Sequence, residues 1–182
     1  TQGNGLFHLE FFPPGKIKKV DHFSTDHGLS SNRIMCIYQD YEENLWVGTE
    51  NGLNFIGNST LGTDASLIVY TTRDGLPHDA INVISGDNSS GILIGTYGGG
   101  LSRYQDGTFT NLSKREGLFN NSILHILTDE RDNLWMSSNQ GIFMLEKSQY
   151  DAYFQGRADR VHCVFYNETD GMKSRECNSI GS

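Results

Sequence analysis

Asp40–Leu53 reads D-Y-E-E-N-L-W-V-G-T-E-N-G-L, and two later stretches of the chain repeat this pattern. Asp87–Leu101 reads D-N-S-S-G-I-L-I-G-T-Y-G-G-G-L, and Asp129–Ile142 reads D-E-R-D-N-L-W-M-S-S-N-Q-G-I. The leading Asp recurs after 47 and then 42 residues. Self-similarity at such a period is typical of stacked structural repeats. The sequence therefore predicts a repeat protein.

A short connector precedes each copy of the pattern. It reads D-H-G-L at Asp26–Leu29 and recurs at Arg73–Leu76, Arg115–Leu118 and Thr169–Met172. A glycine at a fixed place in a repeat indicates a backbone position with positive φ, which glycine adopts without steric cost. We expect the Leu or Met that follows to pack beneath the connector.

Each repeat is predicted to contain four strands. The first strands are Arg33–Tyr38, Ala80–Ser85 and Ser122–Leu127, and the second are the runs Leu45–Val47, Ile92–Ile94 and Leu134–Met136. Because these strands are apolar without clean alternation, we expect both of their faces to be covered. The third strands are Leu53–Ile56, Leu101–Tyr104 and Ile142–Leu145, and the fourth are Leu67–Tyr70, Thr108–Leu112 and Val161–Tyr166.

The turns between the first two strands are Asp40–Asn44, Asp87–Gly91 and Asp129–Asn133. We expect the leading Asp to accept hydrogen bonds from the backbone of its own turn. The closing Asn or Gly is expected to take the left-handed conformation. Asp106-Gly107 predicts a two-residue hairpin between the third and fourth strands of the second repeat.

The third repeat carries an insertion at Lys147–Gly156, whose composition is compatible with a helix. We predict a short helical insertion near residues 148–156 on the rim of the fold, with Ser148 as a candidate N-cap and Gly156 as its stop.

These features together predict an all-β fold, a β-propeller fragment of four-stranded antiparallel blades. Residues 1–25 would be the second half of an upstream blade, and residues 26–72, 73–113 and 114–166 would be about three complete blades. Residues 167–182 would start the next blade, with Met172–Ser182 offering a first strand. Because Thr1 begins in mid-pattern, we interpret the chain as an excised or processed fragment.

Gly28–Leu53, read G-L-S-S-N-R-I-M-C-I-Y-Q-D-Y-E-E-N-L-W-V-G-T-E-N-G-L, closely resembles the two-component regulator propeller repeat. The resemblance covers nearly the whole chain, although Asp79 stands where the pattern prefers Asn and Leu93 where it has Trp. It implies a periplasmic or extracytoplasmic sensor region of an inner-membrane receptor. The histidine kinase, hybrid kinase or diguanylate cyclase domain of such receptors would lie outside this chain, as would the membrane segment.

Composition excludes several classes of partner. The formal charge of −8 and the pI near 5.1 argue against a nucleic acid or an anionic membrane. Cys36, Cys163 and Cys177 are too few for a disulfide framework, so we expect structural thiols, with a Cys163–Cys177 disulfide as the alternative.

No stretch carries a recognisable catalytic, cofactor or metal motif. Tyr97–Gly100 lacks the G-K-[ST] ending of a phosphate loop, the acidic turns lack the full ligand set of a calcium loop, and the six histidines show no pair at metal spacing. His125 is expected to be buried or to face the channel. Trp46 and Trp135 occupy equivalent apolar positions, which favours packing between blades over stacking on a sugar. We therefore expect no catalytic residues, no metal and no cofactor.

A ligand is expected at the mouth formed by the connectors and by the turns between the second and third strands. The polar residues predicted there are His27, Asn32, Arg33, Arg73, Asp74, His78, Tyr97, Arg115, Asn120 and Asn139. The set has no catalytic geometry, so the chain is predicted to sense a ligand, either a small molecule or an oligosaccharide, without turnover. The alternatives are a propeller enzyme, such as a lyase or hydrolase, and a protein-interaction scaffold. Apolar faces at both open ends also predict self-association.

Overall fold

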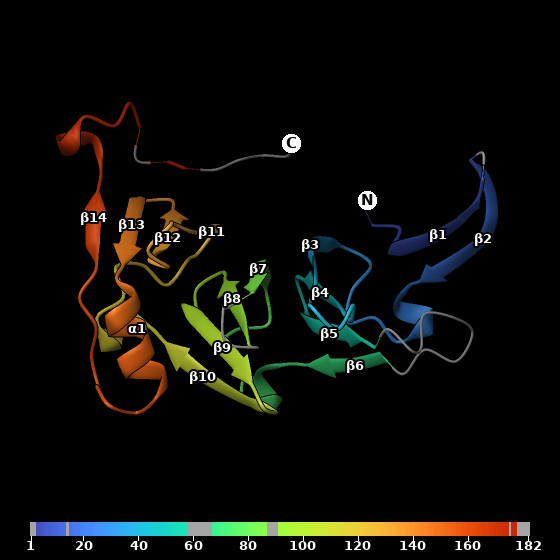
Figure 1. The fold of residues 1–182 in the computed structure, drawn as a ribbon, viewed down its shortest axis with the longest axis horizontal. Helices are drawn as coiled ribbons and strands as arrows, with labels where there is room; N and C mark the ends of the chain where they lie inside the picture. The colour runs from blue at the N-terminus through green and yellow to red at the C-terminus, as the bar shows by residue number, and fades with distance from the viewer. Residues whose placement is uncertain (1–2, 14, 58–66, 87–90, 175, 178–182) are drawn as a thin grey trace.

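The strands of the protein form successive sheets along an arc, in chain order (Figure 1). The structure, a computed structural model, describes residues 3–13, 15–57, 67–86, 91–174 and 176–177. Three sheets have four antiparallel strands each, and a fourth sheet is a two-stranded ribbon. This architecture confirms the predicted β-propeller fold with four-stranded blades.

Each blade has its strands in sequence order from the first to the fourth. The first blade contains β3 (Ile34–Gln39), β4 (Leu45–Thr49), β5 (Gly52–Ile56) and β6 (Leu67–Tyr70). The second contains β7 (Ile81–Gly86), β8 (Ile92–Thr96), β9 (Leu101–Gln105) and β10 (Thr108–Leu112). The third contains β11 (His125–Thr128), β12 (Leu134–Ser138), β13 (Gly141–Leu145) and β14 (Val164–Tyr166). The ribbon, β1 (Leu6–Phe12) with β2 (Lys16–Phe23), precedes them.

The first strands of neighbouring blades lie side by side, since β7 contacts both β3 and β11. Consequently the core lies between blades. One buried cluster joins Trp46 and Leu53 of the first blade to Ile81 and Ile94 of the second. A second cluster joins Leu93 and Leu112 of the second blade to Phe143 of the third.

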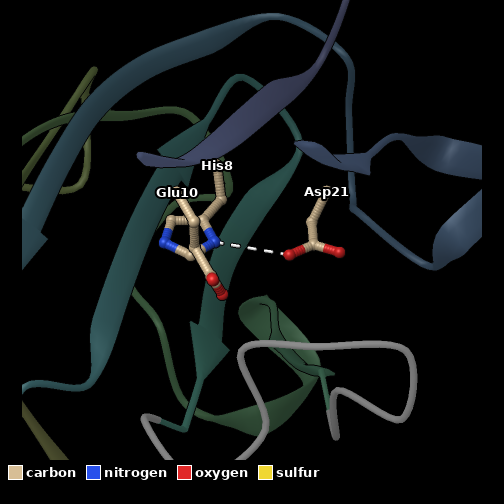
Figure 2. A group of neighbouring side chains, drawn as sticks. All are labelled: His8, Glu10 and Asp21. Carbon is tan, nitrogen blue, oxygen red and sulfur yellow. Dashed lines mark hydrogen bonds and ion pairs between the residues drawn. The ribbon is translucent and has the colours of Figure 1, made fainter. Parts of the chain in front are cut away.

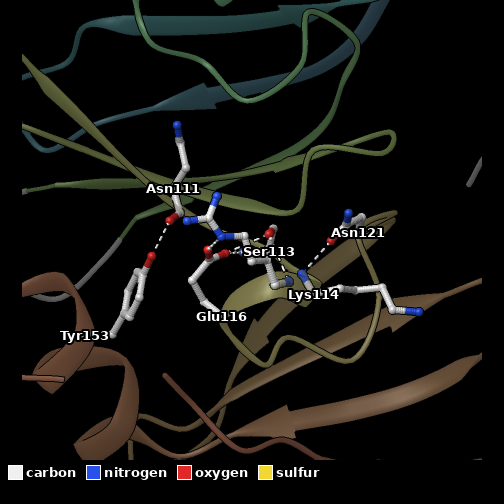
Figure 3. Close-up of polar contacts among 7 residues, drawn as sticks. Asn111, Ser113, Lys114, Glu116, Asn121 and Tyr153 are labelled. Carbon is white, nitrogen blue, oxygen red and sulfur yellow. Dashed lines mark hydrogen bonds and ion pairs between the residues drawn. The ribbon is translucent and has the colours of Figure 1, made fainter. Parts of the chain in front are cut away.

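Every connector forms a short 3₁₀ turn that ends in a glycine of positive φ, as predicted: Gly28 (98°), Gly75 (109°), Gly117 (109°) and Gly171 (95°). Leu29, Leu76 and Leu118 are buried beneath it. In the first three connectors, the first backbone N–H of the turn donates a hydrogen bond to the side-chain oxygen of an Asn or Asp seven residues later. The Thr25 N–H donates to Asn32 Oδ1 and the Thr72 N–H to Asp79 Oδ1. Figure 3 shows the third such bond, from the Lys114 N–H to Asn121 Oδ1.

The hairpin turn after the first strand is organised by its leading Asp. Asp40 Oδ1 accepts from the Glu42 and Asn44 N–H groups, and Asp40 Oδ2 accepts from Trp46 Nε1 at 2.9 Å. The prediction that the closing Asn is left-handed is wrong. The left-handed residue is the one before it, since Glu43 has φ 64° and Asp132 has φ 62°. Asn44 and Asn133 instead donate side-chain hydrogen bonds to that Asp. The predicted turn at residues 87–91 lies mostly outside the described residues.

Strand two of one blade lies so close to strand one of its own blade and of the next that a Cβ does not fit. A Cβ at Gly48 would lie 2.5 Å from Cys36 Sγ and 2.7 Å from Ile81 Cγ2, and one at Gly95 would lie 2.6 Å from Val83 Cγ1 and 2.8 Å from Ile123 Cγ2. These distances are shorter than any ordinary Cβ contact. The third blade has Ser137 at this position.

The prediction that the inner strands are covered on both faces holds for β4 and β8 only. In β3 burial alternates, and Met35 and Ile37 are exposed because the ribbon before it has no inner strands to cover them. In β12 burial also alternates, and Trp135 is only half-buried, because no described third or fourth strand packs against its outer face. Two strands are shorter than predicted, since β11 begins at His125 and β14 begins at Val164.

The insertion forms helix α1 (Lys147–Phe154), and Gly156 follows it with φ 67°. Glu146, not Ser148, occupies the N-cap position, and its side chain makes no capping hydrogen bond. The helix is instead anchored by its aromatic residues. Tyr150 donates to the Asp132 carbonyl, and Tyr153 donates to the Asn111 carbonyl of the second blade at 2.6 Å (Figure 3).

Trp46→Ala should destabilise the protein by about 3 to 5 kcal/mol, the usual cost of removing a buried aromatic side chain. Trp46 is 5% exposed and packs on Phe55 and on Tyr104 of the next blade. Trp135→Ala should cost only roughly 1 to 2 kcal/mol, because that ring already contacts solvent. Urea unfolding of both variants would measure the difference, and equal costs would contradict the assigned blade faces.

The third-blade turn should resist acid until about pH 2. The hydrogen bond from the Trp135 indole, followed by those from Asn133 and Arg131, lowers the pKa of Asp129 from 3.8 to about 2. A lowered carboxyl pKa contributes stability that is present above the unfolded value and is lost as pH falls through the folded value. In a Trp46→Phe background, Asp129→Asn should abolish the change in Trp135 fluorescence between pH 4 and pH 2. Glu130→Gln, in the same turn, should leave that change intact; an unaltered acid profile in the Asp129 variant would refute the assignment.

Candidate functional site

The blades have two ends that differ in chemistry. We call the end with the connectors and the turns between second and third strands the connector end, and the other the hairpin end. All ten residues predicted to meet a ligand belong to the connector end, four of them inside connectors and the rest beside them.

Several of these residues are engaged in hydrogen bonds that hold their own loops. Asn32 accepts from the Thr25 N–H, Asp74 accepts from the Thr71 N–H and hydroxyl, and His78 Nδ1 accepts from the Ala80 N–H. His27 Nδ1 lies 2.8 Å from the Ser24 hydroxyl. These contacts give the side chains a local role in shaping the loops.

The other predicted residues are paired within a blade or point to solvent. Arg33 bonds Glu50 at 3.2 Å, and buried Asn120 donates to Asn139 at 3.4 Å. Arg73, Tyr97 and Arg115 are exposed. The structure thus brings Asn120 and Asn139 together, whereas the rest are distributed over three blades. Whether they bind a ligand stays a prediction.

His125 is exposed on β11, the innermost strand of its blade, which fits the channel-facing alternative rather than the buried one. The three cysteines are unpaired thiols, and burial raises the pKa of Cys36 to about 12. Such a thiol stays protonated and unreactive at neutral pH.

One cluster of potential metal ligands was missed by sequence reasoning. His8, Glu10 and Asp21 offer ligand atoms within 4.8 Å of one another, and Figure 2 shows them on one side of the ribbon. Strand pairing creates the cluster, since His8 lies opposite Asp21 in the β1–β2 register. Both carboxylates are already matched by ammonium groups, Glu10 by Lys18 at 2.8 Å and Asp21 by Lys19 at 3.0 Å. The group is therefore a charge-balanced surface network, in which the lysine hydrogen bonds lower the pKa of both carboxyls.

A cleft of about 600 Å³ lies at the hairpin end, between the first and second blades. Its walls combine aromatic rings with carboxylates, and it is far along the strands from the predicted mouth. Tyr70 lines this cleft. Burial, and then the hydrogen bond between its hydroxyl and that of Tyr104 at 2.9 Å, raise the pKa of Tyr70, so this phenol stays neutral. Sequence reasoning missed the cleft because its two walls come from different repeats.

Comparison with known proteins agrees with this geometry. A family profile described as "Two component regulator propeller" matches residues 28–51 and 117–140. The chain therefore carries two stretches that match the two-component regulator propeller repeat. The second blade lies outside the two matched stretches, in keeping with Asp79 and Leu93. Asp79 nevertheless accepts the same connector hydrogen bond as its Asn counterparts, and Leu93 is buried like Trp46.

One similar protein is histidine kinase P4 of Formosa agariphila, which is 27% identical to this chain over 159 residues. The alignment covers 86% of this chain but 11% of that protein. Among solved structures, the extracellular domain of the hybrid two-component system BT3049 from B. thetaiotaomicron matches with a TM-score of 0.71 and 20% identity, over 94% of this chain and 22% of that one. The extracellular domain of BT4673 matches with a TM-score of 0.66 and 23% identity, over 81% and 20%. The chain thus spans about a tenth to a fifth of these proteins, and the structural matches show the fold. No helix among the described residues is long and apolar enough to span a membrane.

Proposed function

We propose that this chain is a ligand-sensing, non-catalytic propeller segment of a bacterial signalling receptor, exposed to the periplasm or the extracellular space. The observation that carries the proposal is the pair of two-component regulator propeller repeats at residues 28–51 and 117–140. The histidine kinase relative and the extracellular location of the matched structures support it.

Signal output would reside in a histidine kinase or diguanylate cyclase domain of a longer parent protein. Ligand binding to the propeller shifts the equilibrium between conformations, or between arrangements of paired propellers, by its differential affinity for them. A membrane segment of the parent would relay that shift to the cytoplasm. The blades suit this role because their cores lie between them, so that an event at one junction alters the packing of its neighbours.

Thermal unfolding of the chain in the presence of a panel of small molecules and soluble oligosaccharides tests the proposal. A true ligand at about 100 times its Kd should stabilise the protein by about 2.7 kcal/mol. Chromatography of the same mixtures should recover the ligand unchanged. Formation of a product would favour the propeller enzyme, and failure of the whole panel would favour the protein-interaction scaffold.

We also propose that the chain self-associates through its two open faces. In the described junction of blades one and two, Trp46 and Tyr70 are covered by the cross-strand pair Tyr104 and Phe109. The equivalent rings of the third blade, Trp135 and Tyr166, stack on each other but have no such cover among the described residues. The ribbon presents the matching third-and-fourth-strand pair, Leu9 and Val20, with about half of each side chain exposed. A second copy can therefore place its ribbon against the third blade of the first.

Light scattering at micromolar concentration should accordingly detect oligomers, and Leu9→Lys should reduce them by introducing a charge into an apolar contact. Tyr97→Lys, at an exposed site on the connector end, serves as the matched control. A folded protein that is monomeric in both forms would rule out this association.

A further inference from the structure

The cleft at the hairpin end is formed by two blades that leave a gap where their loops meet. One wall is the hairpin turn of the first blade, and the other is the end of β9 with the turn that follows it. Its described lining includes Asp40, Tyr41, Glu42, Trp46, Tyr104 and Asp106. Its volume of about 600 Å³ falls within the range of small-molecule sites in proteins.

The next junction shows why this gap is open. Between the third and fourth strands, the second blade has only the two-residue turn Asp106-Gly107, whereas the third blade has helix α1. That helix packs onto the second blade, with Tyr153 bonded to the Asn111 carbonyl and the Phe154 ring 5.6 Å from the Arg103 guanidinium. No described residue occupies the same space in the first junction. The length of the connection between the third and fourth strands therefore distinguishes the filled junction from the hollow one.

Aromatic rings form the apolar part of the cleft. Tyr41 is 75% exposed on the rim, whereas Trp46 is buried at the base, with Phe55 and Tyr104 packed on it at ring separations of 4.7 and 5.2 Å. An aromatic face carries negative electrostatic potential and attracts a cation placed over it.

Carboxylates supply the only formal charges of the described lining, and none of these residues is Lys or Arg. Asp40 is saturated by hydrogen bonds from its own turn and from Trp46, so it contributes charge but no free acceptor. Glu42 and Asp106 are exposed, one on each wall, and Glu42 also accepts hydrogen bonds from the Tyr41 hydroxyl at 3.1 Å and from the Asn44 amide at 3.2 Å. The cleft therefore attracts cations and repels anions within the screening distance of about 8 to 10 Å.

We propose that this cleft binds an organic cation, an ammonium or quaternary ammonium group seated on the tyrosine rings and balanced by Glu42 and Asp106. This inference rests on the proposed ligand-sensing function and names the chemical class of its ligand and a site away from the connector end. Aromatic walls with nearby carboxylates are the usual protein environment for such groups.

The test compares a cation with a neutral molecule of the same shape by isothermal titration calorimetry. The probes are choline against 3,3-dimethylbutan-1-ol, and glucosamine against glucose. Each cation should bind about tenfold tighter than its neutral partner, and the preference should shrink as salt rises. Equal affinities within both pairs, or absence of binding by both cations, would overturn the proposal.

Matched variants locate the site. Tyr41→Ala should weaken cation binding several-fold, and the double variant Glu42→Gln with Asp106→Asn should remove the preference for the cation; Asn suits the positive φ of 50° at residue 106. Glu130→Gln changes an exposed Glu in the equivalent turn of the third blade and should leave binding unchanged. Binding lost in Arg73→Ala but not in the cleft variants would move the site to the connector end. If neutral oligosaccharides stabilise the chain while the cations do not, the sensing function stands and the cleft assignment fails.

Discussion

The close approach of neighbouring blades at Gly48 and Gly95 is the constraint on which the rest of the structure depends. Because the side chains of Ile81 and Ile123 occupy the space where a Cβ would be, each blade is fixed against the next at the innermost pair of strands. Buried clusters then form between blades rather than within them, so no single sheet has a core of its own.

The third blade shows what changes when this constraint is relaxed. Ser137 replaces the glycine, and its hydroxyl is buried without a partner among the described residues. The Cys177 N–H donates to the Ser138 carbonyl at 3.4 Å. The equivalent hydrogen bond in the preceding junction runs from the Ile123 N–H to the Thr96 carbonyl. A cysteine and a serine thus stand where the earlier junctions have isoleucine and glycine.

The parts of the structure that the sequence predicts are those that repeat. The Asp of each hairpin turn, the glycine of each connector and the order of the strands recur, and a local hydrogen bond or dihedral angle accounts for each. The left-handed residue lies one position before the predicted one, since Glu43 has the positive φ while Asn44 donates to Asp40. Local composition could not show this, because both residues are acceptable in such a turn.

What the sequence could not supply are the features made by contacts between repeats. His8, Glu10 and Asp21 come together only through strand pairing, and the hollow junction depends on the absence of an insertion in the second blade. Trp46 and Trp135 have the same sequence context, yet one is buried and the other half-buried, because burial is set by the neighbouring blade. The sequence therefore points to the connector end, where polar residues gather, although many of these side chains hold their own loops.

Turn length links the architecture to recognition. The blades share one backbone plan, and the two described junctions differ in what lies between the third and fourth strands of their second partner. An eight-residue helix fills one junction with aromatic side chains, and a two-residue turn leaves the other hollow, with carboxylates at its rim. Insertions at this position can open or close a cleft without disturbing the glycine contacts that fix the blades. A sensor of this kind can change its ligand by changing a turn while its transmitting framework stays intact.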